Sequence, residues 1–206
     1  MSTTVAADAA LALLVLYGVL GFGWRSWLQH RRTGSYGFHG VSGSVGSTEW
    51  FAGVGFVVAL AVTVAGPIVQ RAGVVEPIAC AGSGWLPAVG VAVAATGLAA
   101  TVYVQLAMGN SWRIGVNEQE TTALVHTGLF GLIRNPIYTA MITFGLGLAV
   151  LTPNLVTCGG FLLLVAALEL QVRRVEEPHL LRTHGDAYRD YLASVGRFVP
   201  GVGLVR

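Results

Sequence analysis

Several stretches of this chain are apolar enough, and long enough, to cross the hydrocarbon core of a membrane. About 20 helical residues are needed to span about 30 Å of hydrocarbon. Three stretches reach that length, and two shorter ones follow them; they lie at 6–24, 51–70, 85–108, 137–152 and 155–172. Lipid offers no partner to backbone polar groups, so such stretches must be helical. The sequence therefore predicts an all-α, polytopic membrane protein with about five transmembrane helices.

Composition supports this class and excludes others. Of the 206 residues, 54% are hydrophobic and only 11% are charged, whereas soluble domains carry about a quarter charged residues. A net charge of +2 is too small to indicate a nucleic-acid partner. No basic segment precedes the first apolar run, so we expect a retained span rather than a cleaved signal peptide. Cys80 and Cys158 lie far apart and predict neither a disulfide framework nor a zinc site.

The last two apolar runs form a hairpin. Only Pro153 and Asn154 separate them, and so short a connection predicts two antiparallel helices. Small residues in the earlier spans, the pairs Gly18 and Gly21, and Ala95 and Ala99, are expected to let helices approach closely.

The arginines indicate an orientation. Eleven of them follow spans one, three and five, and only Arg71 falls in the opposite loops. The eleven are Arg25, Arg31, Arg32, Arg113, Arg134, Arg173, Arg174, Arg182, Arg189, Arg197 and Arg206. Positive charge is concentrated on the cytoplasmic side of membrane proteins, which predicts an external N-terminus and a cytoplasmic C-terminus. We expect the membrane to be the plasma membrane of a bacterium.

Polar residues gather on the predicted cytoplasmic side, before span four and after span five. Glu169 lies inside an apolar run, where an ionisable group is costly, and it shares a helix face with Arg173 and with Glu176 or Glu177. This face is either a salt-bridged stripe or part of a functional site.

The tail after span five carries further helix signals. Pro178 either interrupts the helix or restarts it as a first-turn residue, and Gly185 is expected to end the next helix. The stretch "DAYRDYLASV" places Tyr188, Tyr191, Leu192 and Val195 on one face. Such an amphipathic helix can lie on the bilayer or close over the hairpin.

Common catalytic motifs are absent from the sequence. It contains no G-x-G-x-x-G, no G-x-S-x-G and no H-E-x-x-H, so dinucleotide-binding, serine hydrolase and metalloprotease readings lack support. His179 and His184 are five residues apart, a poor spacing for zinc on a helix. We expect no metal site.

Several short motifs stand in a fixed order around the two-helix hairpin, within residues 109–201. These are Thr127-Gly128, Arg134-x-Pro136-x-Tyr138, Glu176-Glu177, Gly185-x-x-Tyr188-x-x-Tyr191 and Arg197-x-x-Pro200. In their order and spacing they resemble the isoprenylcysteine carboxyl methyltransferases and the related phospholipid N-methyltransferases. The resemblance implies an S-adenosylmethionine-dependent methyltransferase embedded in the membrane, releasing S-adenosylhomocysteine.

The same resemblance implies roles for individual residues. Cofactor-binding residues would be Val125, His126, Asn135, Pro136, Tyr138, Glu177 and Leu180, and the catalytic residues nearest the reacting centre would be Arg134 and Glu176. Asn135 stands where the family most often has His, and an amide cannot titrate near neutrality. A purely structural account of this stretch makes Asn135 the N-cap and Pro136 the first residue of a helix.

The resemblance also implies a division of labour. Residues 1–108 would shape the membrane and acceptor side, and residues 109–206 would form the cofactor-binding core of one integrated domain. The expected partners are membrane lipids and a lipophilic acceptor; no motif indicates an oligomeric state. Carboxyl O-methylation of an isoprenoid or other lipid-like acid is favoured, with Arg134 binding the carboxylate. In the alternative, N-methylation of a phospholipid amine, Glu176 would accept a proton.

Two further readings come from other classes. A membrane sterol reductase using NADPH shares the C-terminal architecture, but such enzymes are longer and have more spans. A non-catalytic membrane scaffold would not need the intact set Arg134, Tyr138, Glu176 and Glu177.

Overall fold

The computed structural model describes residues 1–37, 40–41, 43–78, 84–109 and 124–205. Within these ranges the chain is helical, and extended segments pair only through isolated bridges, so the all-α prediction is confirmed. The α-helices are α1 (Thr3–Tyr17), α2 (Arg25–Thr33), α3 (Thr48–Arg71), α4 (Leu86–Ala107), α5 (Pro136–Leu151), α6 (Leu155–Gln171), α7 (Glu177–His184) and α8 (Asp186–Ser194). Cys80, Arg113 and Arg206, which entered the sequence analysis, lie outside the described residues.

The helices match the predicted spans closely at most of their ends. Four continuous helices are long and apolar enough to cross a membrane: Thr3–Thr33, Thr48–Arg71, Leu86–Ala107 and Leu155–His184. The fifth, α5, is apolar but has only 16 residues. The fold is thus that of an integral membrane protein, and the count of five spans stays a prediction.

The outer surfaces of these helices are those of a protein that lives in lipid. Large apolar side chains such as Val15, Val57 and Leu162 are more than half exposed. Scattered exposed apolar residues are normal in soluble proteins, but whole apolar helix faces left uncovered are not. Lipid tails would cover these faces.

The first span runs farther than the sequence predicted. The helix that begins at Thr3 continues through a π-helical turn, Gly18–Trp24, into α2. The amide of Gln105 on α4 donates a 2.9 Å hydrogen bond to the carbonyl of Gly21 in that turn, which satisfies a group that the wider turn exposes. The predicted end at residue 24 was therefore too early, and the helix ends at Gly34, whose φ of +77° suits glycine.

The last span also continues beyond its predicted end, through Pro178. A second π-helical turn, Val172–Glu176, joins α6 to α7, and Pro178 occupies the first turn of α7. A proline ring clashes with the carbonyl four residues earlier in a regular α-helix. The wider turn removes that clash, so the helix extends past the proline to His184. Gly185, with a φ of +56°, then ends α7 as predicted.

The hairpin is antiparallel as predicted, but its two helices pack mainly against other partners. Helix α5 packs on α4, and α6 packs on α3. Glycines permit both contacts: a Cβ added at Gly147 would lie 2.2 Å from the Ala94 nitrogen, and one at Gly66 would lie 2.2 Å from the Thr157 hydroxyl. Helix backbones therefore touch within each pair.

The predicted packing residues were partly wrong. Ala95, Ala99 and Gly18 are exposed, whereas Gly21 packs against Tyr17. The contact face of α4 consists instead of Gly90, Ala94, Gly97 and Thr101, all buried.

A buried asparagine organises the turn between α5 and α6. The side-chain oxygen of Asn154 accepts hydrogen bonds from the amides of Val156 and Thr157 at the start of α6. Its side-chain nitrogen donates to Gln70 on α3, at 2.9 Å. The cap thus also links the hairpin turn to a neighbouring helix.

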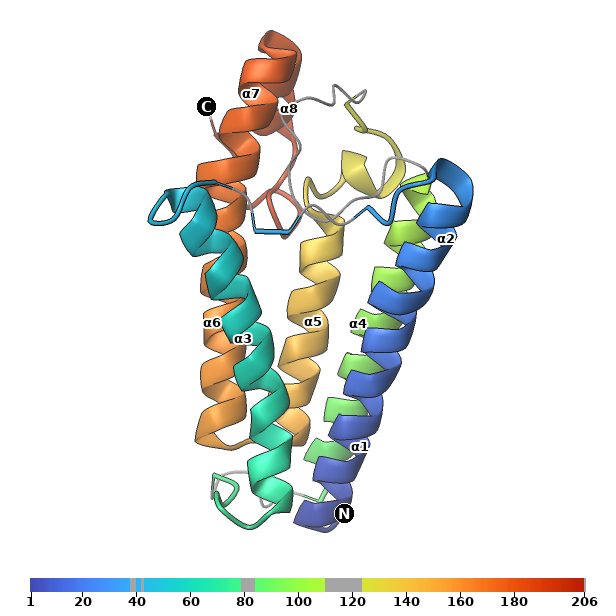
Figure 1. Ribbon diagram of the computed structural model, residues 1–206, viewed down its shortest axis with the longest axis vertical. Coiled ribbons are helices and arrows are strands. Elements are labelled where there is room, and N and C mark those ends of the chain that lie inside the picture. The colour runs from blue at the N-terminus through green and yellow to red at the C-terminus, as the bar shows by residue number, and fades with distance from the viewer. Residues whose placement is uncertain (38–39, 42, 79–83, 110–123, 206) are drawn as a thin grey trace.

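The bundle has two different ends (Figure 1). Helices α2, α7 and α8 lie at one end together with the start of α5, and the N-terminus and the α5–α6 turn lie at the other. The described residues before α5, 124–135, therefore meet those after α6, as the hairpin predicted; residues 110–123 of the same polar segment lie outside the described residues.

Candidate functional site at the start of α5

The C-terminal tail folds back along the start of α5. The amide of Arg134 donates to the carbonyl of Gly196 at 2.8 Å, and the amide of Asn135 donates to that of Arg197 at 3.1 Å. One turn further along α5, the hydroxyl of Thr139 donates to the carbonyl of Phe198 at 2.8 Å. The tail therefore occupies the mouth of α5, between that helix and α7.

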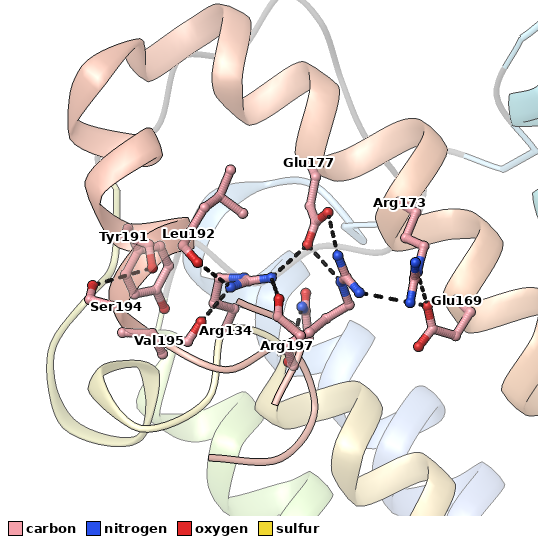
Figure 2. Close-up of polar contacts among 11 residues, drawn as sticks. Arg134, Glu169, Arg173, Glu177, Tyr191, Leu192, Ser194, Val195 and Arg197 are labelled. Carbon is pink, nitrogen blue, oxygen red and sulfur yellow. Dashed lines mark hydrogen bonds and ion pairs between the residues drawn. The ribbon is translucent and has the colours of Figure 1, made fainter. Parts of the chain in front are cut away.

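A buried ion-pair cluster joins the tail to both helices (Figure 2). The Glu177 carboxylate at the start of α7 accepts two hydrogen bonds from Arg197, at 2.8 and 3.0 Å, and one from Arg134, at 2.9 Å. The Arg134 side chain is 1% exposed and the Glu177 side chain 12%. Charges this deep are stable only when they are paired and hydrogen-bonded.

Arg134 is enclosed by further acceptors. Its guanidinium donates to the carbonyls of Leu192, Val195 and Gly203 as well as to Glu177. Its Nε atom is buried and has no hydrogen-bond partner among the described residues. Most of the donors that would hold an acceptor carboxylate are thus already committed to the protein itself.

The cluster continues outward along α6. Arg173 pairs with Glu169, as the i, i+4 spacing predicted, and Glu169 also lies 4.0 Å from a terminal nitrogen of Arg197. The hydrogen bonds to Glu177 raise the pKa of the Arg197 guanidinium above its ordinary value, so this arginine stays charged at any physiological pH. For Glu169 these contacts favour the salt-bridged stripe over a catalytic role.

The other predicted acid, Glu176, faces α5. Its carboxylate accepts a hydrogen bond from the Tyr138 hydroxyl and another, at 3.3 Å, from the amide of Gln171. All three residues are half-buried. The start of α5 and the paired glutamates therefore contact each other directly, through Tyr138 with Glu176 and through Arg134 with Glu177.

Helix α8 closes over the cluster rather than presenting its apolar face to the bilayer. Tyr188, Tyr191 and Leu192 are buried and pack against Leu124, Leu180, Leu181 and Val195. The Tyr191 hydroxyl donates to the carbonyl of Phe130. Burial raises the pKa of the Tyr188 hydroxyl, and it raises the pKa of the Tyr191 hydroxyl to about 12.

The predicted cofactor residues fall into two groups. Asn135, Pro136, Tyr138 and Glu177 lie together around the tail through the contacts above, and Leu180 packs in the α8 cluster. Val125 is half-buried and His126 is exposed, with its ring bonded to the carbonyl of Leu124. Within the described part of the chain, no hydrogen bond or ion pair links Val125 or His126 to the glutamates.

The structural reading of "RNP" is confirmed in part. Asn135 stands at the N-cap position of α5 and Pro136 opens the helix. The Asn135 side chain does not cap the helix, however; its nitrogen donates to the carbonyl of Arg197 at 3.2 Å. The Asn135 side chain therefore bonds to the tail instead of capping α5.

Three residues that hold this arrangement together had no predicted site role. Arg197 was noted only as part of a motif, and Thr139 and Gln171 were not noted. An arginine and a proline three residues apart in the C-terminal tail were the one available signal. The partners of Arg197 and Thr139 lie 20 or more residues away in the chain, beyond the reach of local patterns, whereas Gln171 lies only five residues before Glu176.

The donor set suits S-adenosylmethionine, which carries a sulfonium cation, an amino-acid group, ribose hydroxyls and a flat adenine. The buried, unpartnered Arg134 Nε is a donor for an anionic oxygen, and the Glu176 carboxylate suits a cationic centre. Pro136, Tyr138 and Leu180 offer apolar surface of the kind that lines cofactor sites. Among the described residues, no group of three His, Cys, Asp or Glu side chains could hold a metal ion.

Comparisons with known proteins agree with this chemistry. Residues 85–187, half of the chain, match the family model described as phospholipid methyltransferase. No curated protein sequence matches the chain.

One solved structure gives the fold. It is the eukaryotic intramembrane Ras methyltransferase, isoprenylcysteine carboxyl methyltransferase, which is 21% identical with a TM-score of 0.51. The match covers 76% of this chain but only 53% of that protein, so the chain spans about half the length of the protein whose fold it shares. The matched family, the shared fold and the apolar helices lead to one conclusion: the chain belongs to the phospholipid methyltransferase family and has the fold of an integral membrane protein.

Proposed function

We propose that the protein transfers a methyl group from S-adenosylmethionine to a lipophilic acceptor within the membrane. The observation that carries the proposal is the meeting of the α5 mouth with the paired glutamates, through Tyr138–Glu176 and Arg134–Glu177. This meeting places anionic, cationic and apolar groups together at one end of an otherwise apolar bundle. Asn135, Pro136, Tyr138, Glu177 and Leu180 would hold the cofactor, with Val125 and His126 at its edge.

When bound, S-adenosylmethionine supplies an electrophilic methyl group on a sulfonium. The residues of this chain then have to align the acceptor with that methyl group and exclude water, and alignment alone can supply up to about 7–11 kcal/mol. No acid is needed for the leaving thioether. Tyr138 and Gln171 hold Glu176 in one place by hydrogen bonds, which is the pre-organisation that such a site requires.

The acceptor and the cofactor would reach the site by different routes, one from the lipid bilayer and one from water. We place the acceptor side in residues 1–108, whose apolar helix faces adjoin the lipid, and the cofactor side in residues 109–206, which carry the polar cluster. A lipophilic acceptor would enter sideways from the bilayer, and the polar cofactor would enter from the cytoplasm. This division requires the α7–α8 end of the bundle to be cytoplasmic.

Carboxyl O-methylation of an isoprenoid or other lipid-like acid is the first candidate reaction. A carboxylate is already deprotonated at neutral pH, so it needs no base, and the enclosed Arg134 would act on it only through its one unpartnered nitrogen. The Ras methyltransferase that shares the fold is a carboxyl methyltransferase by name. In this reaction Glu176 positions groups and accepts no proton.

N-methylation of a phospholipid amine is the second candidate, favoured by the half-buried Glu176. An ammonium must lose its proton before it attacks, and the Glu176 carboxylate beside Tyr138 is the group that would accept it. The matched family is named for phospholipid methyltransfer.

One experiment tests the activity and separates the two candidates. Purified protein is incubated with S-adenosylmethionine carrying a labelled methyl group and a lipid extract, and the extracted lipids are then treated with base. Label released by base indicates a methyl ester, and label that resists base indicates a methylamine. Absence of label in the lipids, with folded protein and a range of bacterial extracts, would refute both.

A further inference from the structure

We infer that Arg197 is a positioning residue that fixes the two walls of the proposed cofactor site relative to each other. The inference rests on the proposed function, because it concerns the geometry of that site. Arg197 lies in the tail, in neither wall, and it bonds to both.

The guanidinium of Arg197 sets the position of Glu177. Its Nε and one terminal nitrogen contact the two oxygens of the carboxylate, at 2.8 and 3.0 Å. A two-point contact between planar groups fixes orientation as well as distance. Glu177 therefore has one orientation, with both oxygens turned toward the tail.

The backbone of the same residue sets the position of Asn135. The carbonyl of Arg197 accepts both the amide of Asn135, at 3.1 Å, and its side-chain nitrogen, at 3.2 Å. With its nitrogen held in this way, the Asn135 side chain presents its oxygen elsewhere. The orientation of an α5 residue thus depends on the tail.

The tail in turn is stiffened around Arg197. The amide of Arg197 donates to the carbonyl of Val202 at 2.8 Å, and Arg134 binds the carbonyls of Val195 and Gly203 on either side. Arg197 is 6% exposed, so solvent does not compete for these contacts. The tail around Arg197 is thus a short loop held at both ends, and it keeps α7 and the start of α5 at a fixed distance from each other.

The Arg197 side chain therefore acts through Glu177, without contact to the cofactor, whereas Asn135 is held by the Arg197 backbone carbonyl. Loss of the Arg197 side chain should release Glu177 and so weaken the binding of the cofactor. Lysine keeps the charge but cannot make the two-point contact, so Arg197→Lys should recover only part of the affinity. We expect the positive charge that lysine retains to be insufficient, by itself, to restore full cofactor affinity.

The test is calorimetric titration of S-adenosylhomocysteine into the full-length protein in lipid nanodiscs. We expect Arg197→Ala to raise the dissociation constant at least about tenfold, with Arg197→Lys between it and the wild type. Arg189→Ala is the matched control, because Arg189 pairs with Asp186 on the exposed face of α8; it should bind within about twofold of the wild type. Wild-type affinity in folded Arg197→Ala would overturn the inference.

A double variant separates positioning from direct contact. If Arg197 acts through Glu177, Arg197→Ala combined with Glu177→Ala should bind no more weakly than Glu177→Ala alone. Multiplied losses would mean that Arg197 touches the cofactor itself, and the inference would fail.

A second readout keeps the proposed function and this inference apart. Hydrogen exchange without ligand should show the amides of α7 and of the start of α5 less protected in Arg197→Ala than in the wild type. If the wild type binds no S-adenosylhomocysteine, the proposed function fails, and the exchange result alone decides whether Arg197 fixes the two walls. Unchanged exchange would refute the inference.

Discussion

At the scale of single residues, the candidate site depends on a few buried charges that satisfy one another. Glu177 is the centre of this set, because two arginines bind it, one from the tail and one from the segment just before α5. Arg134 also donates to three backbone carbonyls, and these hydrogen bonds hold the tail in place. A hydrophobic bundle tolerates these charges only as a complete set.

Replacing Glu177 should therefore destabilise the protein as well as weaken the binding of its cofactor. Glu177→Gln leaves two buried guanidinium groups without a carboxylate, which costs about 3–5 kcal/mol. Glu169→Gln is the control, because its carboxylate is 34% exposed and exposed pairs contribute about 1 kcal/mol or less. Thermal unfolding in one detergent compares the two. Equal melting temperatures would contradict the buried cluster.

The raised pKa of the Tyr191 hydroxyl predicts that the stability of the protein falls at alkaline pH. Its pKa in the folded protein is about 12, against about 10 for an exposed tyrosine. Above pH 10 the unfolded chain loses this proton before the folded protein does, so stability is full below pH 10 and falls toward pH 12.

Tyr191→Phe removes this titration, at the cost of one hydrogen bond to Phe130 worth about 1 kcal/mol. The variant should therefore be less stable at pH 9, and its stability should fall less between pH 10 and 12. Chemical denaturation at several pH values measures both. A parallel decline in the two proteins would exclude Tyr191 as the titrating group.

At the scale of helices, the bundle consists of two close pairs, α4 with α5 and α3 with α6. Glycines make this closeness possible, because a Cβ at Gly147 would lie 2.2 Å from the backbone of Ala94. The pairing places the start of α5 opposite the α6–α7 junction, where Tyr138 meets Glu176. Helix packing thereby sets the width of the candidate site.

Gly147→Ala should push α5 away from α4. Overpacking of this kind lowers the free energy of unfolding by about 1–3 kcal/mol. The displacement of α5 should also weaken the binding of S-adenosylhomocysteine. Gly159→Ala is the matched control on α6, because nothing lies within 4 Å of its added Cβ. It should be neutral, or stabilising by up to about 1 kcal/mol through helix propensity. Identical unfolding of the two variants would refute the close α4–α5 contact.

Helix existence and order followed from the sequence, whereas helix faces and ends did not. Long apolar runs have one solution in lipid, so the five helices could be predicted within a few residues at most of their ends. Ala95 and Ala99 were wrong because lipid-facing and protein-facing positions are equally apolar. The π-helical turns that carry the helices past Trp24 and Pro178 leave no pattern that separates them from a helix end.

For the candidate site, most of the residues could be predicted, but the contacts that hold them could not. The resemblance to a family singled out Asn135, Tyr138, Glu176 and Glu177, and the structure links Tyr138 to Glu176 directly and Asn135 to Glu177 through Arg197. Arg134 was expected to bind an acceptor, yet its partners are mostly backbone carbonyls supplied by a distant tail. Backbone acceptors carry no sequence signature, which is why the contacts of Arg134 and Arg197 with the tail could not be predicted; the catalytic role of Arg134 stays a prediction.

At the scale of the whole molecule, the two ends of the bundle have different chemistry. The polar cluster, α7, α8 and most of the arginines lie at one end, and the hairpin turn and the N-terminus lie at the other (Figure 1). The asymmetry supports a cytoplasmic location for the polar end.

Thiol labelling tests this orientation. In a background with Cys80 and Cys158 changed to Ser, a membrane-impermeant maleimide added to intact cells should label Val74→Cys, which follows α3, and spare Ser194→Cys at the end of α8. Permeabilised cells should label both. The reverse pattern in intact cells would contradict the orientation and the proposed entry of the cofactor from the cytoplasm.

The most direct test of the central claim is calorimetric titration of the purified, folded protein with S-adenosylhomocysteine, with NADPH as the comparison ligand. The account predicts saturable binding of S-adenosylhomocysteine, none of NADPH, and at least about tenfold weaker binding by Glu177→Ala. Binding of NADPH alone would favour a reductase, and binding of neither would favour a scaffold. Either result would contradict the methyltransferase proposed here.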